Sequence, residues 1–182
     1  MDTDYLLHHA SNVTVVALVA ISAWCVLDKP TSLFYFLVGG MTSMVVNLIV
    51  KNIVRQKRPV MEIKQAKMRQ YFRDMHMYYR NGVNVDYFGM PSGHTQTAFF
   101  ALTFDYLVLH HVNLAVASAI AAVFIAWQRY VSMHHSIPQI LVGAALGVAM
   151  GFLFSHMAKS SLQGNMARKK CDHCLLPPAS LY

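Results

Sequence analysis

Residues 88–100 read FGMPSGHTQTAFF and place a proline, a serine, a glycine and a histidine directly before an apolar run. Pro and Gly break the preceding chain, and Ser accepts hydrogen bonds from the first unpaired N–H groups of a helix. Those N–H groups and the helix dipole also attract phosphate. The stretch therefore predicts the first turn of an apolar helix, with either an ordinary cap or an anion site at its N-terminus.

The composition indicates a membrane protein. Of the 182 residues, 55% are hydrophobic and only 13% are charged, about half the charged fraction of a typical soluble domain. The formal net charge is +7. Basic residues interleaved with long apolar runs fit anionic lipid head groups better than nucleic acid. We therefore expect a single domain with the membrane as its partner, and no nucleic acid.

The apolar runs predict an all-α fold, a polytopic membrane helical bundle of about five transmembrane helices. Each run approaches the roughly 20 residues that cross a bilayer. The runs cover residues 10–27, 32–50, 95–111, 112–128 and 137–156. Residues 1–9 contain no Lys or Arg, so the first run is interpreted as a retained helix and not a signal peptide. Five crossings put the termini on opposite sides and gather the N-terminus, residues 51–91 and the link at 128–136 on one side.

We expect residues 1–160 to form one membrane-embedded domain and residues 161–182 a flexible polar tail. Residues 51–91 form a basic loop that holds nine of the fifteen Lys and Arg residues. Apolar residues at helical spacing within it predict an interfacial helix, either a lid or a simple connection; they are Met68, Phe72, Met75 and Tyr79. In the tail, Cys171 and Cys174 have too few neighbouring ligands for a closed zinc site, so lipidated or free thiols are favoured.

The stretch KNIVRQKRP, residues 51–59, continues the second apolar run until Pro59 stops the helix. Lys51, Arg55 and Arg58 then lie at i, i+4 and i+7 on one helix face, so three cations project together. The alternative is ordinary snorkelling of basic side chains at a membrane edge.

A third polar stretch, WQRYVSMHHSIPQILVG at residues 127–143, joins the fourth and fifth runs. Arg129 ends the fourth run, and Ser136 is a suitable cap for the fifth. His135 lies just before that helix, and Gln139 is four residues further on and able to reach it. The topology predicts that this histidine shares one side of the membrane with the PSGH histidine and the cations.

Phosphate chemistry uses such a set in a definite way. The cations neutralise the phosphoryl oxygens, and arginine adds a forked donor geometry. The N–H groups of Ser92 and Gly93, with the Ser92 hydroxyl, complete the cradle. One imidazole attacks phosphorus in line and the other protonates the leaving oxygen, so neither a metal nor a cofactor is expected. Surrounding cations keep the attacking imidazole neutral.

These residues resemble the type 2 phosphatidic acid phosphatase superfamily, which also includes the vanadium haloperoxidases. The family pattern is K-x6-RP, then PSGH, then SR-x5-H-x3-D. Lys51 to Pro59 matches the first motif, residues 91–94 match the second, and Arg129 with His135 matches the third at the required spacing. The motifs span about half of the chain. Each is weak alone, but three in this order are a specific signal.

The resemblance implies that His135 is the nucleophile that forms a phosphohistidine and that His94 is the general acid. It also implies which residues hold the phosphate: Lys51, Arg58, Ser92, Gly93 and Arg129. Members of the family are typically metal-independent and all-helical. Membrane-bound members often have six transmembrane helices, one more than the apolar runs of this chain.

The chain departs from the family pattern at two positions. Gln128 stands in place of Ser, and Gln139 stands in place of the Asp that orients the nucleophilic histidine. An amide oxygen can accept the His135 N–H but brings no charge. The dolichyl diphosphate phosphatase and glucose-6-phosphatase branches resemble this chain in having Gln there, so Gln139 is interpreted as a branch marker. Residues 94–96, HTQ, resemble a His-polar-Gln sequence of the dolichyl branch and favour an isoprenoid diphosphate substrate.

The prediction is an integral membrane lipid phosphatase that removes a phosphate from an isoprenoid (di)phosphate or a related lipid phosphate. Two alternatives stay open: a broad phosphatase for phosphatidic acid and similar lipids, and an inactive relative that binds lipid phosphates. By analogy with the family, the active site faces the lumen or the exterior.

Two further features concern the helices themselves. Asp105, about eleven residues into the third run, is either a functional group at mid-membrane depth or a hydrogen-bonded helix contact. The glycine spacings at 39–40 and at 143, 147 and 151 predict close packing between helices.

Overall fold

The computed structural model describes residues 3–59 and 88–163, which form five α-helices and no strand. The helices are α1 (Thr3–Cys25), α2 (Pro30–Val54), α5 (Gly93–Leu109), α6 (Val112–Val131) and α7 (Ile137–Gln163). Outside the helices, Lys57 and Phe88 form an isolated antiparallel bridge. The predicted all-α fold is confirmed, and each predicted apolar run corresponds to one helix.

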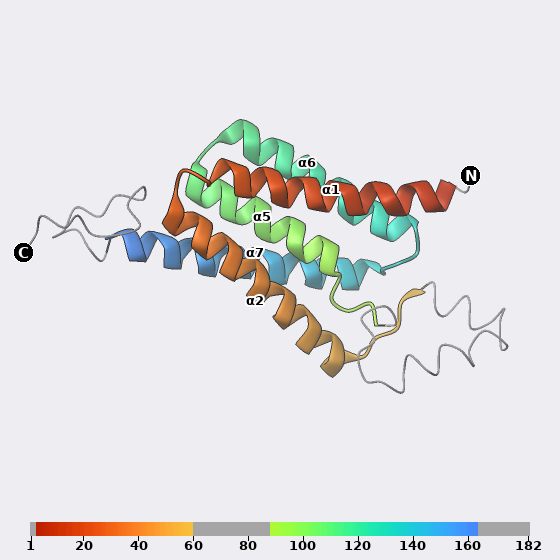
Figure 1. The fold of residues 1–182 in the computed structure, drawn as a ribbon. Coiled ribbons are helices and arrows are strands. Elements are labelled where there is room, and N and C mark those ends of the chain that lie inside the picture. Colours follow the sequence, from red (N-terminus) through yellow and green to blue (C-terminus); the bar gives the residue numbers. More distant parts are fainter. Residues whose placement is uncertain (1–2, 60–87, 164–182) are drawn as a thin grey trace, which may run out of the picture.

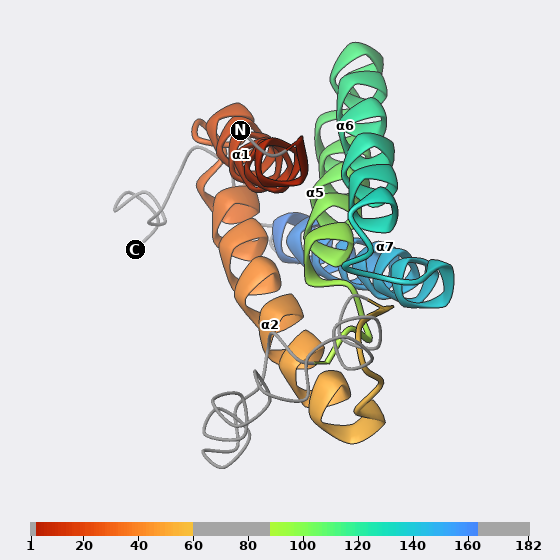
Figure 2. The same cartoon turned by 90° about the vertical axis from the view of Figure 1, so that its right-hand side faces the viewer.

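Helix α5 lies at the centre of the bundle. It packs against all four of the other described helices, most extensively against α7, and Figure 2 shows it surrounded by them. Figure 1 places the first turn of α1 and the last turn of α7 at opposite ends of the bundle. This arrangement agrees with an odd number of crossings.

The helix boundaries follow from local chemistry. Pro30 starts α2, where its fixed φ and missing N–H suit a first turn. The α5–α6 link is short because His110 adopts a left-handed conformation, with φ 54°, that reverses the chain. Arg55 is also left-handed, with φ 50°, and ends α2. The expected continuation of this helix to Pro59 is therefore wrong, and the segment after Val54 leaves the helix axis (Figure 1).

Three of the described helices are long and apolar enough to cross a membrane: Pro30–Val54, Val112–Val131 and Ile137–Leu162. Ala10–Cys25 of α1 is a shorter apolar helix. Helix α5 has 17 residues, about 26 Å at the α-helical rise. Large apolar side chains such as Met41 and Ile120 are more than half exposed, at 69% and 67%, which suits contact with lipid. The chain is a polytopic membrane helical bundle with α5 shielded by its neighbours.

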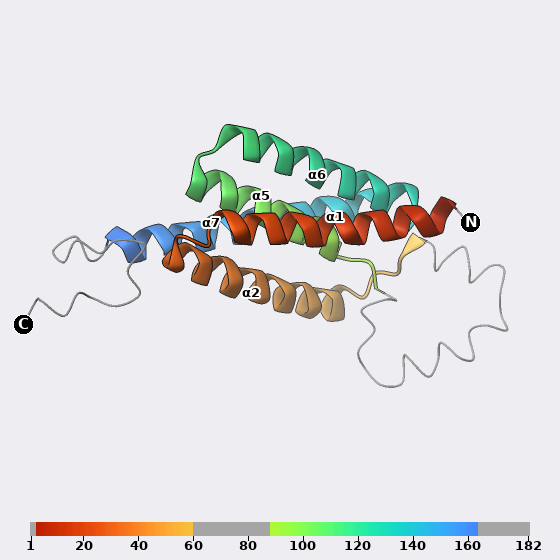
Figure 3. The same ribbon diagram turned by 45° about the horizontal axis from the view of Figure 1, so that its top comes forward.

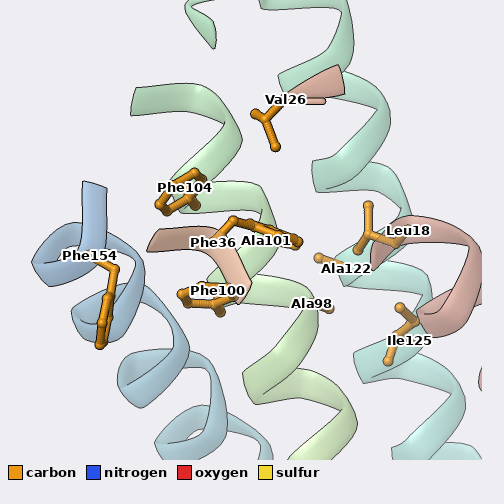
Figure 4. Packing of buried hydrophobic residues seen from close by; sticks show 10 residues of the cluster. All are labelled: Leu18, Val26, Phe36, Ala98, Phe100, Ala101, Phe104, Ala122, Ile125 and Phe154. Carbon is orange, nitrogen blue, oxygen red and sulfur yellow. The ribbon is translucent and has the colours of Figure 1, made fainter. Parts of the chain in front are cut away.

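Aromatic rings join α2, α5 and α7 in the interior. Phe36 of α2 lies 5.6 Å from Phe100 and 5.4 Å from Phe104 of α5, measured between ring centroids. These are the separations of favourable aromatic pairs. Phe154 of α7 completes the cluster (Figure 4). The cluster fixes α2 against α5, and so keeps the end of α2 beside the start of α5.

Small residues on α7 let its backbone approach α5 closely. Gly143, Gly147 and Gly151 recur every fourth residue and therefore share one helix face. A Cβ at Gly143 would lie 2.6 Å from the carbonyl oxygen of Ser92, and one at Gly147 would overlap the carbonyl of Gln96. The predicted close packing is confirmed for these three glycines, which let α7 lie directly against the PSGH turn and the helix that follows it.

Two predicted features lie outside the described residues. They are the interfacial helix around residues 68–79 and the polar tail with Cys171 and Cys174. Helix α7 continues to Gln163, past the domain boundary expected at residue 160.

We expect Gly147→Ala to lower the free energy of unfolding by about 1–3 kcal/mol, because overpacking forces α5 and α7 apart. Gly40→Ala is the matched control: its added Cβ would meet the Phe100 ring at 3.8 Å, an ordinary contact, and alanine favours a helix. Thermal unfolding in detergent, followed by size-exclusion chromatography, measures both variants. Equal midpoints would contradict the tight contact between α5 and α7.

Candidate active site

The helices gather their polar segments at one end of the bundle. Figures 1 and 3 place the first turn of α1, the end of α2, the start of α5 and the α6–α7 link at this end. The site residues predicted from the sequence lie at the end of α2 or just after it, at the start of α5, in the last turn of α6, in the α6–α7 link and in the first turn of α7. The expectation that the polar stretches share one side is therefore confirmed for the described residues.

The α6–α7 link places His135 back against the end of α6. Met133 is left-handed, with φ 55°, and the Arg129 carbonyl accepts the N–H groups of His134 at 3.2 Å and His135 at 3.1 Å. His135 is only 2% exposed, and the Arg129 charge acts on its ring. The chain between Arg129 and His135 is thus a single tight turn. This turn explains their spacing in the motif and brings the two side chains together.

A backbone carbonyl orients the His135 ring. Nδ1 lies 2.8 Å from the carbonyl oxygen of Gly89, which can only accept, so Nδ1 carries the hydrogen and Nε2 carries the lone pair. Burial, followed by the charges of Arg58 and Lys51, lowers the pKa of His135 to about 2. The imidazole is therefore neutral at physiological pH, as a nucleophile must be.

Gln139 joins neighbouring segments and does not hold the imidazole. Its Oε1 accepts the Ser136 N–H at 3.2 Å. Its Nε2 donates to the Lys57 carbonyl at 2.9 Å and to Gln56 Oε1 at 3.2 Å. The expected hydrogen bond from His135 to this amide is wrong, because a backbone carbonyl takes the Nδ1 hydrogen instead.

The start of α7 explains why Gln139 turns backward. Residues 136–139 read SIPQ, and the Gln139 contact to the Ser136 N–H is the glutamine half of a capping box. The Ser136 hydroxyl, expected to cap this helix, is buried with no hydrogen-bond partner in the described part of the chain. Glutamine therefore supplies the cap in place of serine, and this hydrogen bond fixes the direction of the Gln139 side chain.

Gly89 connects the Gln139 amide to His135. Its N–H donates to the Gln56 carbonyl at 2.7 Å, and its carbonyl holds the imidazole. A Cβ at this position would overlap the Gln139 side-chain amide. Gln139 thus positions His135 indirectly. Its side chain holds residues 56 and 57, and the Gln56 carbonyl in turn holds the N–H of Gly89.

The PSGH turn is held by the same region of α7. The Ser92 N–H donates to the Gln139 carbonyl at 3.0 Å, and the Ser92 and Thr95 hydroxyls share a hydrogen bond of 2.9 Å. The expectation that the Ser92 N–H binds phosphate is wrong here, because α7 already uses this donor. Of the two backbone donors expected at the turn, the Gly93 N–H remains a candidate.

A buried polar network braces this turn against α2. Asn47 Nδ2 donates to Gln96 Oε1 at 2.7 Å, and Gln96 Nε2 donates to the carbonyl and the hydroxyl of Ser43, both at 2.8 Å. Gln96 is 1% exposed. These contacts are structural. The glutamine of the HTQ sequence, whose resemblance favoured an isoprenoid substrate, packs α5 against α2 in this structure.

Basic side chains surround the buried imidazole. Lys51 is 5% exposed and Arg129 is 1% exposed. Arg58, Lys51 and Arg129 each act electrostatically on His135. These three cations come from α2, from the segment after it and from α6, so the tertiary structure brings together all three predicted phosphate-binding cations.

Arg55 does not join this group. Its left-handed backbone ends α2, its side chain is exposed, and its Nε donates to the Asn52 carbonyl at 2.9 Å. The prediction that Arg55 shares a helix face with Lys51 and Arg58 is wrong, because the helix ends before the third cation.

Arg129 has neutral hydrogen-bond partners within the described residues. Its Nη2 donates to Ser11 Oγ at 2.6 Å and to Asn12 Oδ1 at 2.7 Å. Its Nε is buried without a hydrogen-bond partner in residues 3–59 and 88–163. A guanidinium keeps its charge and is costly to bury unless an anion compensates it. The site is therefore suited to phosphate, which accepts from arginine in a forked geometry.

His94 contacts a helix that sequence reasoning did not assign to the site. Its Nε2 lies 2.7 Å from Asn12 Oδ1 on α1. Asn12 and Ser11 were missed because α1 carries none of the three motifs. Their signal in the sequence is a Ser-Asn pair at the start of an apolar run, where polar side chains are expected to face protein.

Asp105 belongs to a helix contact away from this site. Ser22 of α1 donates to its carboxylate at 2.6 Å, and Asp105 is 1% exposed. The structure agrees with the second of the two interpretations, a hydrogen-bonded contact between helices.

Comparison with known proteins identifies the family. A family model described as the PAP2 superfamily matches residues 31–162. The chain belongs to the PAP2 superfamily. The matched segment begins after α1 and contains every site residue expected from the sequence. No solved structure matches the chain.

A curated relative is named by its reaction. It is a dolichyldiphosphatase from Saccharomyces cerevisiae (strain ATCC 204508 / S288c), 21% identical over 161 residues. The similarity covers 83% of this chain and 62% of the relative. The chain therefore spans about three fifths of the length of that relative.

We expect Gln139→Glu to lower the free energy of unfolding by about 1–3 kcal/mol at neutral pH, because a carboxylate would face the Lys57 carbonyl without a donor. The loss should shrink in acid, where a protonated Glu donates again. Thermal unfolding across a pH series measures the effect, with Asn52→Asp at an exposed helix position as the control. A stable Gln139→Glu protein at neutral pH would show that this amide does not join the segments.

Proposed function

We propose that the chain is an integral membrane lipid phosphatase. The observation that carries this proposal is the buried Arg129 guanidinium, with neutral partners and an unused Nε donor, beside the buried His135 imidazole. A phosphoryl group would supply both the negative charge and the acceptor oxygens that this arrangement needs. Membership of the PAP2 superfamily and a relative named dolichyldiphosphatase support the same class of reaction.

In the first half-reaction, His135 is the nucleophile. Its Nε2 lone pair attacks phosphorus in line as the bond from phosphorus to the leaving oxygen breaks, which forms a phosphohistidine. The electron pair of the broken bond stays on the leaving oxygen, which takes a proton from protonated His94. The remaining phosphoryl oxygens are held by the candidate ligands, which are the side chains of Lys51, Arg58 and Arg129, the Ser92 hydroxyl and the Gly93 N–H.

In the second half-reaction, water releases the phosphate. The water oxygen attacks phosphorus and passes a proton to His94, which is now neutral. The bond between phosphorus and Nε2 of His135 breaks, and its electron pair returns to the ring. Inorganic phosphate leaves, and both histidines recover their starting protonation without a metal or a cofactor.

A neutral orienting group is compatible with this chemistry. The Gly89 carbonyl accepts the Nδ1 hydrogen of His135, and its dipole favours the positive charge that grows on the ring during attack. The orienting function that the family assigns to Asp is then divided between this carbonyl and the bracing amide of Gln139. The absence of a carboxylate at position 139, which was the argument for an inactive relative, is therefore compatible with an active enzyme.

For the substrate, we propose an isoprenoid diphosphate or monophosphate, with the active site facing the lumen or the exterior. The name of the yeast relative and the resemblance of residues 94–96 to the dolichyl branch support the isoprenoid group. A broad phosphatase that accepts phosphatidic acid is the second candidate. Membership of the PAP2 superfamily supports it, because the family match by itself does not select one lipid.

The test is phosphate release by detergent-solubilised protein in excess EDTA, with an isoprenoid diphosphate and phosphatidic acid compared side by side. We expect release that survives the chelator and is lost in His135→Ala, because the variant lacks the Nε2 lone pair that attacks phosphorus in the proposed mechanism. His156→Ala, an exposed histidine on α7, is the matched control. An acid-labile phosphoryl label should appear on the wild type and be missing from His135→Ala. Activity that persists in folded His135→Ala would sink the mechanism.

A matched pair of arginines tests the phosphate site separately. We expect Arg58→Ala to weaken competitive inhibition by inorganic phosphate at least about tenfold, as the loss of a charge-assisted hydrogen bond predicts. Arg55→Ala should leave inhibition unchanged, because Arg55 is exposed and bonded to its own helix. The measurement is the inhibition constant of inorganic phosphate for each variant, determined in the lipid phosphatase assay. Equal effects from the two variants would contradict the assignment of Arg58.

A further inference from the structure

Asn12 on α1 connects two parts of the proposed machinery. Its Oδ1 lies 2.7 Å from Nε2 of His94 and 2.7 Å from Nη2 of Arg129. Helix α1 ends at Cys25, before the segment that matches the PAP2 model begins at residue 31. This contact therefore comes from a part of the chain that the family match does not cover.

The donor and acceptor types assign the hydrogens. Arginine has only donors, so the atom that Asn12 presents to Arg129 must be its carbonyl oxygen. The same oxygen faces His94, so Nε2 of His94 must carry a hydrogen and donate it. The two lone pairs of one amide oxygen then serve a guanidinium and an imidazole.

We propose that Asn12 is a positioning residue for the general acid, an inference that rests on the phosphatase function proposed above. With Nε2–H of His94 held by Asn12, the proton given to the leaving oxygen is the one on Nδ1. The bond from phosphorus to oxygen breaks, its electron pair goes to that oxygen, and the Nδ1 proton follows. His94 is left neutral with Nε2–H still donated to Asn12.

Asn12 also fixes the acid relative to the phosphate. Arg129 is a candidate phosphate ligand, and it is held on α1 by both Ser11 and Asn12. One amide oxygen thus sets the separation between a phosphate ligand and the group that protonates the leaving oxygen. General acid catalysis depends on this placement, because a proton is transferred only within hydrogen-bond reach.

The leaving group separates this role from simple helix packing. A basic leaving oxygen needs the acid, whereas a stabilised phenolate needs it much less. Phenyl phosphate and p-nitrophenyl phosphate are similar in size and differ in this property. Loss of a positioned acid lowers turnover of phenyl phosphate most, whereas a general loss of structure lowers both equally.

The experiment measures kcat and KM for both aryl phosphates with wild type, Asn12→Leu, Asn12→Asp and Thr14→Val. We expect Asn12→Leu to lower kcat/KM, which reports only the steps up to departure of the leaving group, by about 100-fold on phenyl phosphate, the scale of general acid catalysis. The same variant should lower kcat/KM on p-nitrophenyl phosphate far less. Thr14→Val should match the wild type, because within the described residues the Thr14 hydroxyl bonds only to the Ala10 carbonyl on the same helix.

Asn12→Asp keeps the acceptor and the shape, so it should restore kcat on phenyl phosphate relative to Asn12→Leu. It should also raise KM, because its negative charge offsets Arg129. Equal losses of kcat/KM on the two substrates in Asn12→Leu, or full activity on both, would overturn the positioning role. A wild type that is folded but inactive on these and on lipid phosphates removes the phosphatase function and the role of Asn12 with it. An active wild type with an unaffected Asn12→Leu removes only the latter.

Discussion

The hydrogen bond from Nδ1 of His135 to the Gly89 carbonyl sets the chemistry of the polar end of this bundle. It fixes the tautomer, and with it the nitrogen that keeps a lone pair. The contact exists only because three segments meet: the α6–α7 link, the start of α7 and the chain just before the PSGH turn. Burial and nearby cations then hold the pKa of this imidazole far below its usual value. The orientation and the protonation state of this imidazole thus both depend on how these helix ends pack.

The packing of the helix ends depends in turn on small and amide side chains. Glycines on α7 let its backbone lie against α5 at the PSGH turn, and Asn47 and Gln96 tie that turn to α2. These residues carry no charge, so their burial needs only hydrogen-bond partners. The cations are the exception, because Arg129 is buried among neutral groups. An apolar bundle with a cationic end of this kind is prepared for an anionic ligand.

The glutamine at position 139 illustrates how one position changes its role with its surroundings. In the family pattern, a carboxylate there orients the histidine directly. Here the amide is turned toward the start of its own helix and toward residues 56 and 57, and a backbone carbonyl takes over the contact with the ring. An amide suits this position because it donates and accepts at the same time, whereas a carboxylate only accepts.

The sequence by itself determined the helices and the family motifs. Apolar runs of membrane length predicted five helices, and the topology of five crossings predicted that Lys51, Arg58, Arg129 and His135 lie at one end. Topology works in this way because each apolar run crosses the membrane once, so every second polar link lies on the same side. Only the tertiary structure decided the partners of the site residues, which are Gly89 for His135 and Asn12 for His94. It also showed that Arg55 lies outside the site. Hydrogen bonds between segments far apart in the chain depend on side-chain direction and helix packing, and these leave no periodic signal in the sequence.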